Sequence, residues 1–506
     1  MKPIYKEYLK DYQRAGIDRI KDLKGRVILA DEPGLGKTIQ TLAYLYEAQR
    51  FPALIVCPAS LKLNWQQEIK KWLDLYDVYI CEGTNNIVAK CNIAARHKII
   101  IINYDILINW VYELYYNAGI RAYVFDEAHL IKDNKEVYNR HPKMKYGILC
   151  TGANDRVSAT DFLMRHACYA SKIFITGTPV VNGVADMANF LYWIEPFLLD
   201  GYKEFLKRYT NEEYNHRLKK IEYLGGNNLI ELNDLLKYNF MIRRVKKSEL
   251  PDLPNKNRIF IPVECEFYAK LGRRVPINEL QKERVARTEY ILPTVISWIK
   301  DFLESDKKLV VFCNFTATVD ALKNEFKEQC VVFDGRCSTE QKDNAVKEFQ
   351  SNPYKKVFIG NLQAAGVGIT LTAADTVLTV DFAHTVKDHY QAEDRVCRIG
   401  QKSNNVTAYY IYVPNSVDEQ MVDNLNEKAV VAKGAVDGQE VLEADLFIRD
   451  SFKRQYTDEE KKNLRKEYII NELKDFGLMM LLAVIAGLTF NLFFSILDFY
   501  KDKDEY

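Results

Sequence analysis

The chain has 506 residues, of which 48% are hydrophobic and 27% charged, so it can form folded cores in roughly three domains. Its formal net charge of +1 excludes a protein that is basic throughout, and any nucleic-acid site must therefore be a local patch. The ten cysteines form no CxxC pair and there are only seven histidines, which argues against a zinc module and favours a reducing, intracellular compartment.

The N-terminal segment is charged and has no apolar core, so it predicts no signal peptide. A short helical pattern follows over residues 9–16 and carries Gln13. A glutamine amide can donate to and accept from an adenine edge at the same time. Gln13 is therefore a candidate for reading the base of a nucleotide, and an ordinary surface glutamine is the alternative.

The next element is a glycine-rich turn between a strand-like run (27–30) and a helical pattern (39–46), and it reads DEPGLGKT over residues 31–38. In this context the turn predicts a phosphate loop, because glycines let backbone amides face phosphate oxygens at a helix N-terminus. Lys37 would reach the β- and γ-phosphates and Thr38 would ligate Mg²⁺. Asp31 stands where the usual GxxxxGKT pattern has its first glycine, so an ordinary glycine turn is the alternative.

Buried-type strands are predicted over residues 53–57 and 99–102, with a helix over residues 64–69 between them. This alternation predicts parallel βαβ units, in which ligands gather at the carboxyl ends of the strands. Ser60 and Asn103 follow those ends and are candidates for phosphate contacts. The alternative is that both residues only cap turns.

A strand over residues 122–125 ends in Asp126-Glu127-Ala128-His129. Two carboxylates at the end of a buried strand are costly unless a cation or hydrogen bonds satisfy them. With a phosphate loop upstream, Asp126 is predicted to hold Mg²⁺, and Glu127 to orient and deprotonate the attacking water. A solvated acidic turn is the alternative.

The stretch 132–170 is largely polar and is interpreted as a surface insertion. The strand at 173–175 ends in TGTP (176–179), whose hydroxyls either relay the state of the nucleotide or belong to a simple turn. Residues 195–240 have helical periodicity. A basic, proline-containing linker follows, with Arg243, Arg244, Lys246 and Lys247, which either contacts a phosphate backbone or is solvated.

A second α/β unit begins near residue 259, with strands expected at 309–313, 331–333, 356–360 and 376–381. Asn314 follows the first of these strands. Arg395 and Arg398 are three residues apart, so the spacing predicts one face of a helix. Next to an ATP site in another domain they are candidate arginine fingers, and a solvated helix face is the alternative.

The segment 476–497 is 22 residues without a charge, long enough to cross a bilayer as one helix. Seven Lys or Arg residues lie between positions 453 and 474, and this asymmetry would keep the preceding body on the cytoplasmic side. A helix that packs against the globular body is the alternative.

These blocks, in this order, resemble the Swi/Snf family of helicase superfamily two, and their wording is most similar to the annealing-helicase, fork-remodelling branch. The resemblance covers residues 9 to about 428 and rests on DEPGLGKT, DEAH, TGTP, RRVKK…LPDLP, QAAGVGITLTAAD and QAEDRVCRIGQ. It implies an α/β fold of two tandem RecA-like lobes, with ATP and Mg²⁺ in the cleft between them. Asp31 in the loop is usual in this family, whereas Cys397 and Val181 depart from its pattern.

The resemblance also implies a set of site residues. The catalytic residues are Lys37, Glu127, Arg395 and Arg398. The ATP contacts are Gln13, Asp31, Glu32, Gly34, Leu35, Gly36, Lys37, Thr38, Gly366 and Gln391. The Mg²⁺ ligands are Thr38 and Asp126. Apart from the resemblance, the candidate DNA contacts are Ser60, Asn103, Asn314 and Gln363.

The expected organisation is a first lobe (1–242), a basic linker (243–258), a second lobe (259–436), a charged helical tail (437–475) and the hydrophobic helix (476–497). The expected function is a DNA-dependent ATPase that moves along or remodels duplex or forked DNA without sequence preference. Two alternatives stay open. One is a strand-separating helicase, and the other is a membrane-tethered, nucleic-acid-binding ATP switch.

Overall fold

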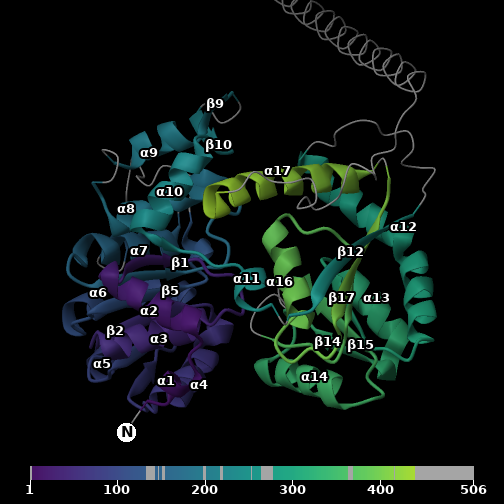
Figure 1. The fold of residues 1–506 in the computed structure, drawn as a ribbon, viewed down its shortest axis with the longest axis horizontal. Coiled ribbons are helices and arrows are strands. Elements are labelled where there is room, and N and C mark those ends of the chain that lie inside the picture. Colours follow the sequence, from purple (N-terminus) through teal and green to yellow (C-terminus); the bar gives the residue numbers. More distant parts are fainter. Residues whose placement is uncertain are drawn as a thin grey trace, which may run out of the picture.

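The computed structural model describes residues 3–132, 143–145, 148–150, 154–197, 201–216, 220–251, 253–263, 277–362, 369–414 and 416–438. Two α/β lobes lie side by side in it, one formed by the N-terminal half of the chain and one by the C-terminal half (Figure 1). The predicted membrane span at 476–497 and nearly all of the charged tail lie outside these ranges. Within them, no helix has the length and apolar character that a membrane crossing requires.

The first lobe is built on a seven-stranded parallel sheet in the order β11-β1-β8-β5-β2-β4-β3. Its central strands are continuous apolar runs because helices cover both faces of the sheet. The two faces carry separate hydrophobic cores. The strands are β1 (Arg26–Leu29), β2 (Ala53–Cys57), β3 (Val78–Ile80), β4 (Ile99–Asn103), β5 (Ala122–Asp126), β8 (Ser171–Ile175) and β11 (Met241–Ile242).

The helices of this lobe place the predicted motifs at the carboxyl edge of the sheet. The phosphate loop joins β1 to α3, and DEAH follows β5. The helices are α1 (Tyr5–Tyr8), α2 (Asp11–Asp22), α3 (Lys37–Glu47), α4 (Lys62–Leu73), α5 (Ile87–Ala94), α6 (Tyr104–Asn117), α7 (Asp155–His166), α8 (Ala188–Ile194), α9 (Tyr202–Tyr209) and α10 (Leu229–Asn239).

Two sequence interpretations of this lobe are wrong. The stretch 132–170 is not only a surface insertion, because α7 buries Val157, Ala159 and Leu163 completely in the core. The region 195–240 is not helical throughout, because β9 (Asn211–Asn215) and β10 (Lys220–Leu224) form an antiparallel hairpin between α9 and α10. A second short antiparallel pair joins β6 (Lys143–Lys145) and β7 (Ile148–Cys150).

The second lobe has a six-stranded parallel sheet in the order β12-β17-β16-β13-β15-β14. Two hydrophobic cores again lie on its two faces. The predicted fold of two α/β lobes with parallel sheets is therefore confirmed. The strands are β12 (Asn255–Pro262), β13 (Leu309–Cys313), β14 (Cys330–Phe333), β15 (Val357–Asn361), β16 (Thr376–Thr379) and β17 (Asn405–Tyr412).

Two helices connect the lobes in space. The short α11 (Lys246–Glu249) lies between them, and α17 (Val417–Asp437) runs along one side of both lobes (Figure 1). The end of α17 is held on the first lobe, where Asn233 Nδ2 in α10 donates a hydrogen bond to Ala435 O at 3.0 Å. The other helices of the second lobe are α12 (Ile277–Leu303), α13 (Thr316–Phe326), α14 (Thr339–Ser351) and α16 (Val386–Val396).

Candidate nucleotide site between the lobes

The phosphate loop turns sharply before α3. Gly34 and Gly36 have φ angles of 94° and 76°, in the left-handed region that favours glycine. A Cβ atom on Gly36 would lie 2.4 Å from Gln13 Nε2, so the loop also requires glycine for space. Thr38 lies in the first turn of α3, directly after Lys37. The loop therefore has the backbone that the sequence predicts for binding phosphate.

Lys37 folds back over its own loop. Its Nζ donates to Asp31 O at 2.7 Å and to Glu32 O at 3.2 Å. Burial lowers the pKa of Lys37, and the carboxylates of Glu127, Asp31 and Asp126 oppose that shift. The ammonium group is thus enclosed at the loop with the acidic residues of DEAH close by.

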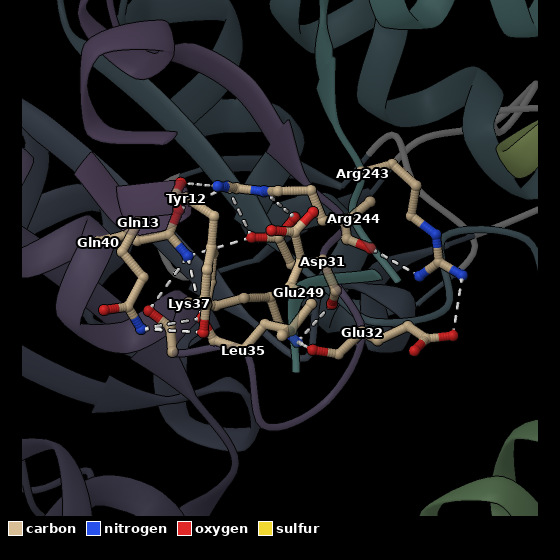
Figure 2. A network of polar contacts seen from close by, with 12 residues as sticks. Tyr12, Gln13, Asp31, Glu32, Leu35, Lys37, Gln40, Arg243, Arg244 and Glu249 are labelled. Carbon is tan, nitrogen blue, oxygen red and sulfur yellow. Dashed lines mark hydrogen bonds and ion pairs between the residues drawn. The ribbon is translucent and has the colours of Figure 1, made fainter. Parts of the chain in front are cut away.

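Gln13 lies against the phosphate loop, as expected for a residue of the nucleotide site (Figure 2). Its Nε2 donates to Leu35 O at 3.2 Å, and its Oε1 accepts from Lys10 N at 3.0 Å. The alternative of a surface glutamine is wrong, because the residue is only 9% exposed.

Asp31 and Glu32 face the linker (Figure 2). The fully buried Asp31 carboxylate accepts from Arg244 Nε at 3.0 Å and from Arg244 Nη2 at 2.8 Å, and Gln40 Nε2 adds a bond of 3.1 Å. Glu32 Oε2 accepts from Lys246 N at 2.7 Å. These two carboxylates therefore hold the linker to the loop.

Two side chains of the basic linker, Arg243 and Lys246, are largely buried by contacts within the protein. Arg243 Nη1 donates to Ala30 O at 2.9 Å, and its Nε contacts Asp437 Oδ1 at 2.8 Å. Lys246 Nζ contacts Asp394 Oδ2 in the second lobe at 2.6 Å. The side chains of Arg243 and Lys246 are 11% and 14% exposed. The solvated alternative is therefore wrong for these two residues, and a contact with a phosphate backbone stays a prediction.

The DEAH residues lie at the end of β5, at the same edge as the loop. Asp126 Oδ2 accepts from Trp65 Nε1 at 2.8 Å, and Oδ1 accepts from Glu127 N at 2.9 Å. Glu127 has a φ of 51°, and its Oε2 lies 3.2 Å from His129 Nδ1. The solvated acidic turn is wrong, because both carboxylates are enclosed among polar partners.

The environments of the two carboxylates differ. Burial raises the pKa of Asp126, and the neighbouring Glu127 charge raises it further. Burial also acts to raise the pKa of Glu127, but His129, Lys387 and Lys37 outweigh it and hold that pKa below its usual range. The charge of Glu127 is thus balanced by cations and His129, whereas Asp126 lies beside a second negative charge.

The TGTP turn contacts both motifs. Thr176 Oγ1 lies 3.5 Å from His129 Nδ1. A Cβ atom on Gly177 would lie 2.9 Å from Pro33 Cδ, so the turn packs directly on the phosphate loop. This placement favours the relay interpretation over that of an isolated turn.

The second lobe brings cations to this site through α16. Lys387 Nζ contacts His129 Nε2 and lies 3.9 Å from Glu127 Oε2. Arg395 is only 8% exposed. Burial, and to a lesser degree the charge of Arg398, lower its pKa to about 10. The carboxylates of Asp394 and Glu127 act in the opposite direction. The charge of Arg395 is therefore within electrostatic reach of Glu127 in the first lobe.

Arg398 does not share a helix face with Arg395, which corrects the expectation from their spacing. Helix α16 ends at Val396, because Cys397 leaves the helical region with φ −80° and ψ 76°. Arg398 Nη1 then donates to Ile369 O at 2.9 Å. Burial lowers the Arg398 pKa, and the carboxylates of Asp394 and Glu68 oppose this.

A cavity of about 830 Å³ lies where the loop, the TGTP turn and the linker meet α16 and α17. Gln391 is buried and lines it, together with Glu32, Thr178, Lys246 and Lys387. The predicted ATP contact Gly366 lies outside the described residues, and so does the DNA candidate Gln363.

The other DNA candidates differ in their surroundings. Ser60 is exposed in the turn after β2. Asn103 is 7% exposed at the neighbouring strand end, and its Nδ2 lies 3.4 Å from Asp105 Oδ2. Asn314 Nδ2 donates to Phe382 O at 2.8 Å and thus fixes a strand end. Of these three residues, Ser60 is the most accessible.

Sequence reasoning missed Trp65, Arg244 and Lys387 as parts of the site. Trp65 lies 61 positions from the Asp126 that it contacts, and Arg244 lies 213 positions from Asp31. Of these three residues, only Arg244 had a local signal in the sequence, because it belongs to the basic cluster of the linker. A pattern within one window does not reveal such long-range partners.

The SNF2-related domain profile matches residues 12–148 and 155–309 of this chain, and the helicase conserved C-terminal domain matches residues 294–400. Among solved structures, the Sulfolobus solfataricus SWI2/SNF2 ATPase core in complex with dsDNA is 23% identical. The match covers 87% of this chain and 96% of the Sulfolobus chain, with a TM-score of 0.39.

Relatives are similar over most of this chain but are longer. An uncharacterized ATP-dependent helicase of Mycoplasma pneumoniae is 26% identical over 86% of this chain and 43% of its own length. The DNA annealing helicase and endonuclease ZRANB3 of Bos taurus is 28% identical over 92% of this chain and 44% of its own length. The chain thus spans less than half the length of these two relatives. Because the SNF2-related domain profile matches more than half of its residues, the chain belongs to the SNF2-related family.

Proposed function

We propose that the protein is a DNA-stimulated ATPase that moves along or remodels duplex or forked DNA without sequence preference. One observation carries the proposal. Cations of the second lobe reach the acidic residues of the first, with Lys387 Nζ 3.9 Å from Glu127 Oε2. A site completed by two lobes can couple hydrolysis to their relative movement.

The residues at the loop fit ATP and Mg²⁺. The left-handed glycines leave room for phosphate oxygens beside the backbone, and Lys37 supplies the enclosed positive charge. Mg²⁺ is usually held by one or two carboxylates together with substrate phosphates. Asp126, whose carboxylate oxygens each keep a free lone-pair direction, and Thr38 are the proposed ligands. Mg²⁺ would supply charge neutralisation on the phosphate oxygens.

The proposed hydrolysis uses residues of both lobes. Glu127 orients a water molecule and accepts its proton as the water oxygen attacks the γ-phosphorus. The bond from that phosphorus to the bridging oxygen breaks, and ADP and phosphate are released. Arg395 and Arg398 stabilise the charge of the transferred group. Gln391 lies on α16, one turn before Arg395, and lines the cavity. Gln13 is proposed to read the adenine.

DNA is the proposed partner because of the family and its named relatives. The ZRANB3 relative is named a DNA annealing helicase and endonuclease, and the Mycoplasma pneumoniae relative an ATP-dependent helicase. Contacts to phosphates would give binding without sequence preference. The test is ATP turnover with single-stranded DNA, duplex, fork and RNA. Duplex or fork DNA should stimulate turnover most, and equal rates with and without every nucleic acid would contradict the proposal.

Two alternatives remain testable. A forked-duplex displacement assay distinguishes a strand-separating helicase, which would release the displaced strand, from a translocase that leaves the duplex paired. Cell fractionation with and without residues 476–506 tests the intracellular, membrane-tethered switch. A full-length protein recovered wholly without membranes would remove the tether. We propose residues 1–242 as the first lobe, 243–258 as the linker and 259–436 as the second lobe, with the last residues of the linker already forming the start of β12 in the second-lobe sheet.

A further inference from the structure

The linker between the lobes is held at both ends by ion pairs. At its start, Arg244 pairs with the buried Asp31, and Glu32 N donates to Arg244 O at 3.0 Å. At its end, Arg258 Nε and Nη2 bind the two oxygens of Glu393 at 2.7 and 2.8 Å. The linker therefore follows the first lobe where it begins and the second lobe where it ends.

Lys246 lies at the point where these two attachments meet. Its backbone N is fixed by Glu32 Oε2 at 2.7 Å, next to the phosphate loop. Its Nζ reaches Asp394 Oδ2 at 2.6 Å on α16. Asp394 directly precedes Arg395, the proposed arginine finger. One residue thus spans from the loop that would hold the phosphates to the helix that carries the finger.

Asp394 has a second lysine partner of a different kind. Lys256 Nζ lies 2.6 Å from Asp394 Oδ1, and Lys256 belongs to β12 in the same sheet as the rest of the second lobe. When the lobes separate, the Lys246 contact must break while the Lys256 contact remains. The buried Asp394 carboxylate then keeps Lys256 as its partner and is not left as an unpaired charge. The contact between Lys246 and Asp394 can therefore open and close reversibly.

We infer that Lys246 is a positioning residue, which holds Asp394 and through it Arg395 at a set distance from the phosphate loop when the lobes are closed. The inference rests on the proposed ATPase function. It assigns the linker a direct part in assembling the site, in addition to joining the lobes. Lys246 itself does not touch the reacting atoms.

The first test compares Lys246→Met with two controls. Lys247→Met removes the exposed neighbouring lysine of α11, and Lys246→Arg keeps a cation that can reach Asp394. A misplaced finger should lower kcat of Lys246→Met about 10–100-fold, because small misplacements cost up to about 10²-fold. KM for ATP should stay within about twofold, since the loop is intact. Both controls should keep kcat near the parent value, and a parent-like kcat for Lys246→Met would overturn the inference.

The second test asks whether Lys246 acts through Asp394. If it does, the double variant Lys246→Met with Asp394→Asn should lose no more kcat than Asp394→Asn alone. Losses that multiply would show that Lys246 acts elsewhere and would overturn the inference. The unfolding temperature of Lys246→Met should equal that of the parent, because Lys256 still pairs with Asp394.

The third test needs no turnover. Dyes are introduced by non-natural amino acids at the exposed residues Tyr116 in the first lobe and Tyr354 in the second, and energy transfer is measured without nucleotide. Lys246→Met should broaden the distribution of distances between the lobes, and Lys247→Met should not. An unchanged distribution in Lys246→Met would contradict the inference. A parent protein without ATPase activity would defeat the proposed function, and this measurement would still decide the role of Lys246.

Discussion

The Arg244 guanidinium makes a two-bond contact with the Asp31 carboxylate, with Nη2 2.8 Å from Oδ2 and Nε 3.0 Å from Oδ1. Bidentate pairs of this kind fix geometry as well as charge. Asp31 is the first residue of the phosphate loop and Arg244 is the second residue of the linker, so the pair ties the start of the nucleotide site to the connection between the lobes. The aspartate that breaks the usual loop pattern thus has a fixed partner in the linker.

Replacing Arg244 by methionine should destabilise the first lobe. The Asp31 carboxylate is fully buried, and breaking a buried pair by removing one partner costs about 3–5 kcal/mol. Urea unfolding followed by tryptophan fluorescence measures the loss. Adding Asp31→Asn to Arg244→Met should recover a large part of it, because the stranded charge disappears. A double variant no more stable than the single one would contradict this account.

Replacing Glu127 by glutamine should abolish turnover and leave nucleotide binding intact. The amide keeps the shape of the side chain but cannot accept the proton of water, a loss of about 10²–10⁴ in rate for general base catalysis. Hydrolysis and binding of a fluorescent ATP analogue are measured on the same preparation. Lys37→Ala is the contrasting variant, since it should weaken binding as well as turnover.

Replacing Arg395 by lysine should lower kcat by about 10³-fold or more, the usual range for an arginine finger. Lysine keeps the positive charge but lacks the planar fork that binds two oxygens. The affinity for ATP should change little, because the phosphate loop of the first lobe is unaltered. Equal kcat values for Arg395→Lys and the parent would exclude Arg395 as the finger.

The stability of the second lobe should fall with acid through Glu393. Burial acts to raise the pKa of this carboxylate, but Arg258, Lys256 and Tyr410 outweigh it and lower the pKa from 4.5 to about 2. A carboxylate whose pKa is lower in the folded than in the unfolded protein stabilises the fold at pH values above the unfolded pKa. This stabilisation is lost as the pH falls from 4.5 toward 2. The shift corresponds to about 3 kcal/mol at neutral pH.

Glu393→Gln tests this pH dependence. The variant should be less stable than the parent at neutral pH, and the difference should shrink as pH falls through the same window. Urea unfolding monitored by circular dichroism at a series of pH values provides the measurement. A difference that stays constant down to pH 2 would contradict the assignment to Glu393.

The central strands could be predicted because local sequence is enough to define them. The expected strands at 53–57 and 309–313 have the same bounds in the structure, since both are continuous apolar runs. The inner strand β17 was missed, and so were the edge strands β3 and β12. The two edge strands are partly exposed, and their sequences lack the apolar run that burial on both faces imposes. The first half of β17 alternates between buried and more exposed residues and so lacks that run as well.

The sequence predicted the motifs that carry the chemistry of the site, but not the long-range contacts that connect them. The positions of the loop and of DEAH follow from motifs within one strand and turn. The contacts of Arg244 with Asp31 and of Lys246 with Asp394 join residues 213 and 148 positions apart, and nothing in either local window specifies them. The end of α16 was also missed, because three-residue spacing predicts a shared face only while the helix continues.

The most direct measurement of the central claim is the rate of ATP hydrolysis with and without duplex DNA at low and at moderate salt, with Glu127→Gln as the blank. The account predicts that duplex DNA raises turnover of the parent protein, that the stimulation falls steeply with added salt, and that the blank stays inactive. A rate that is the same with and without DNA, or a blank that hydrolyses ATP as fast as the parent, would contradict it.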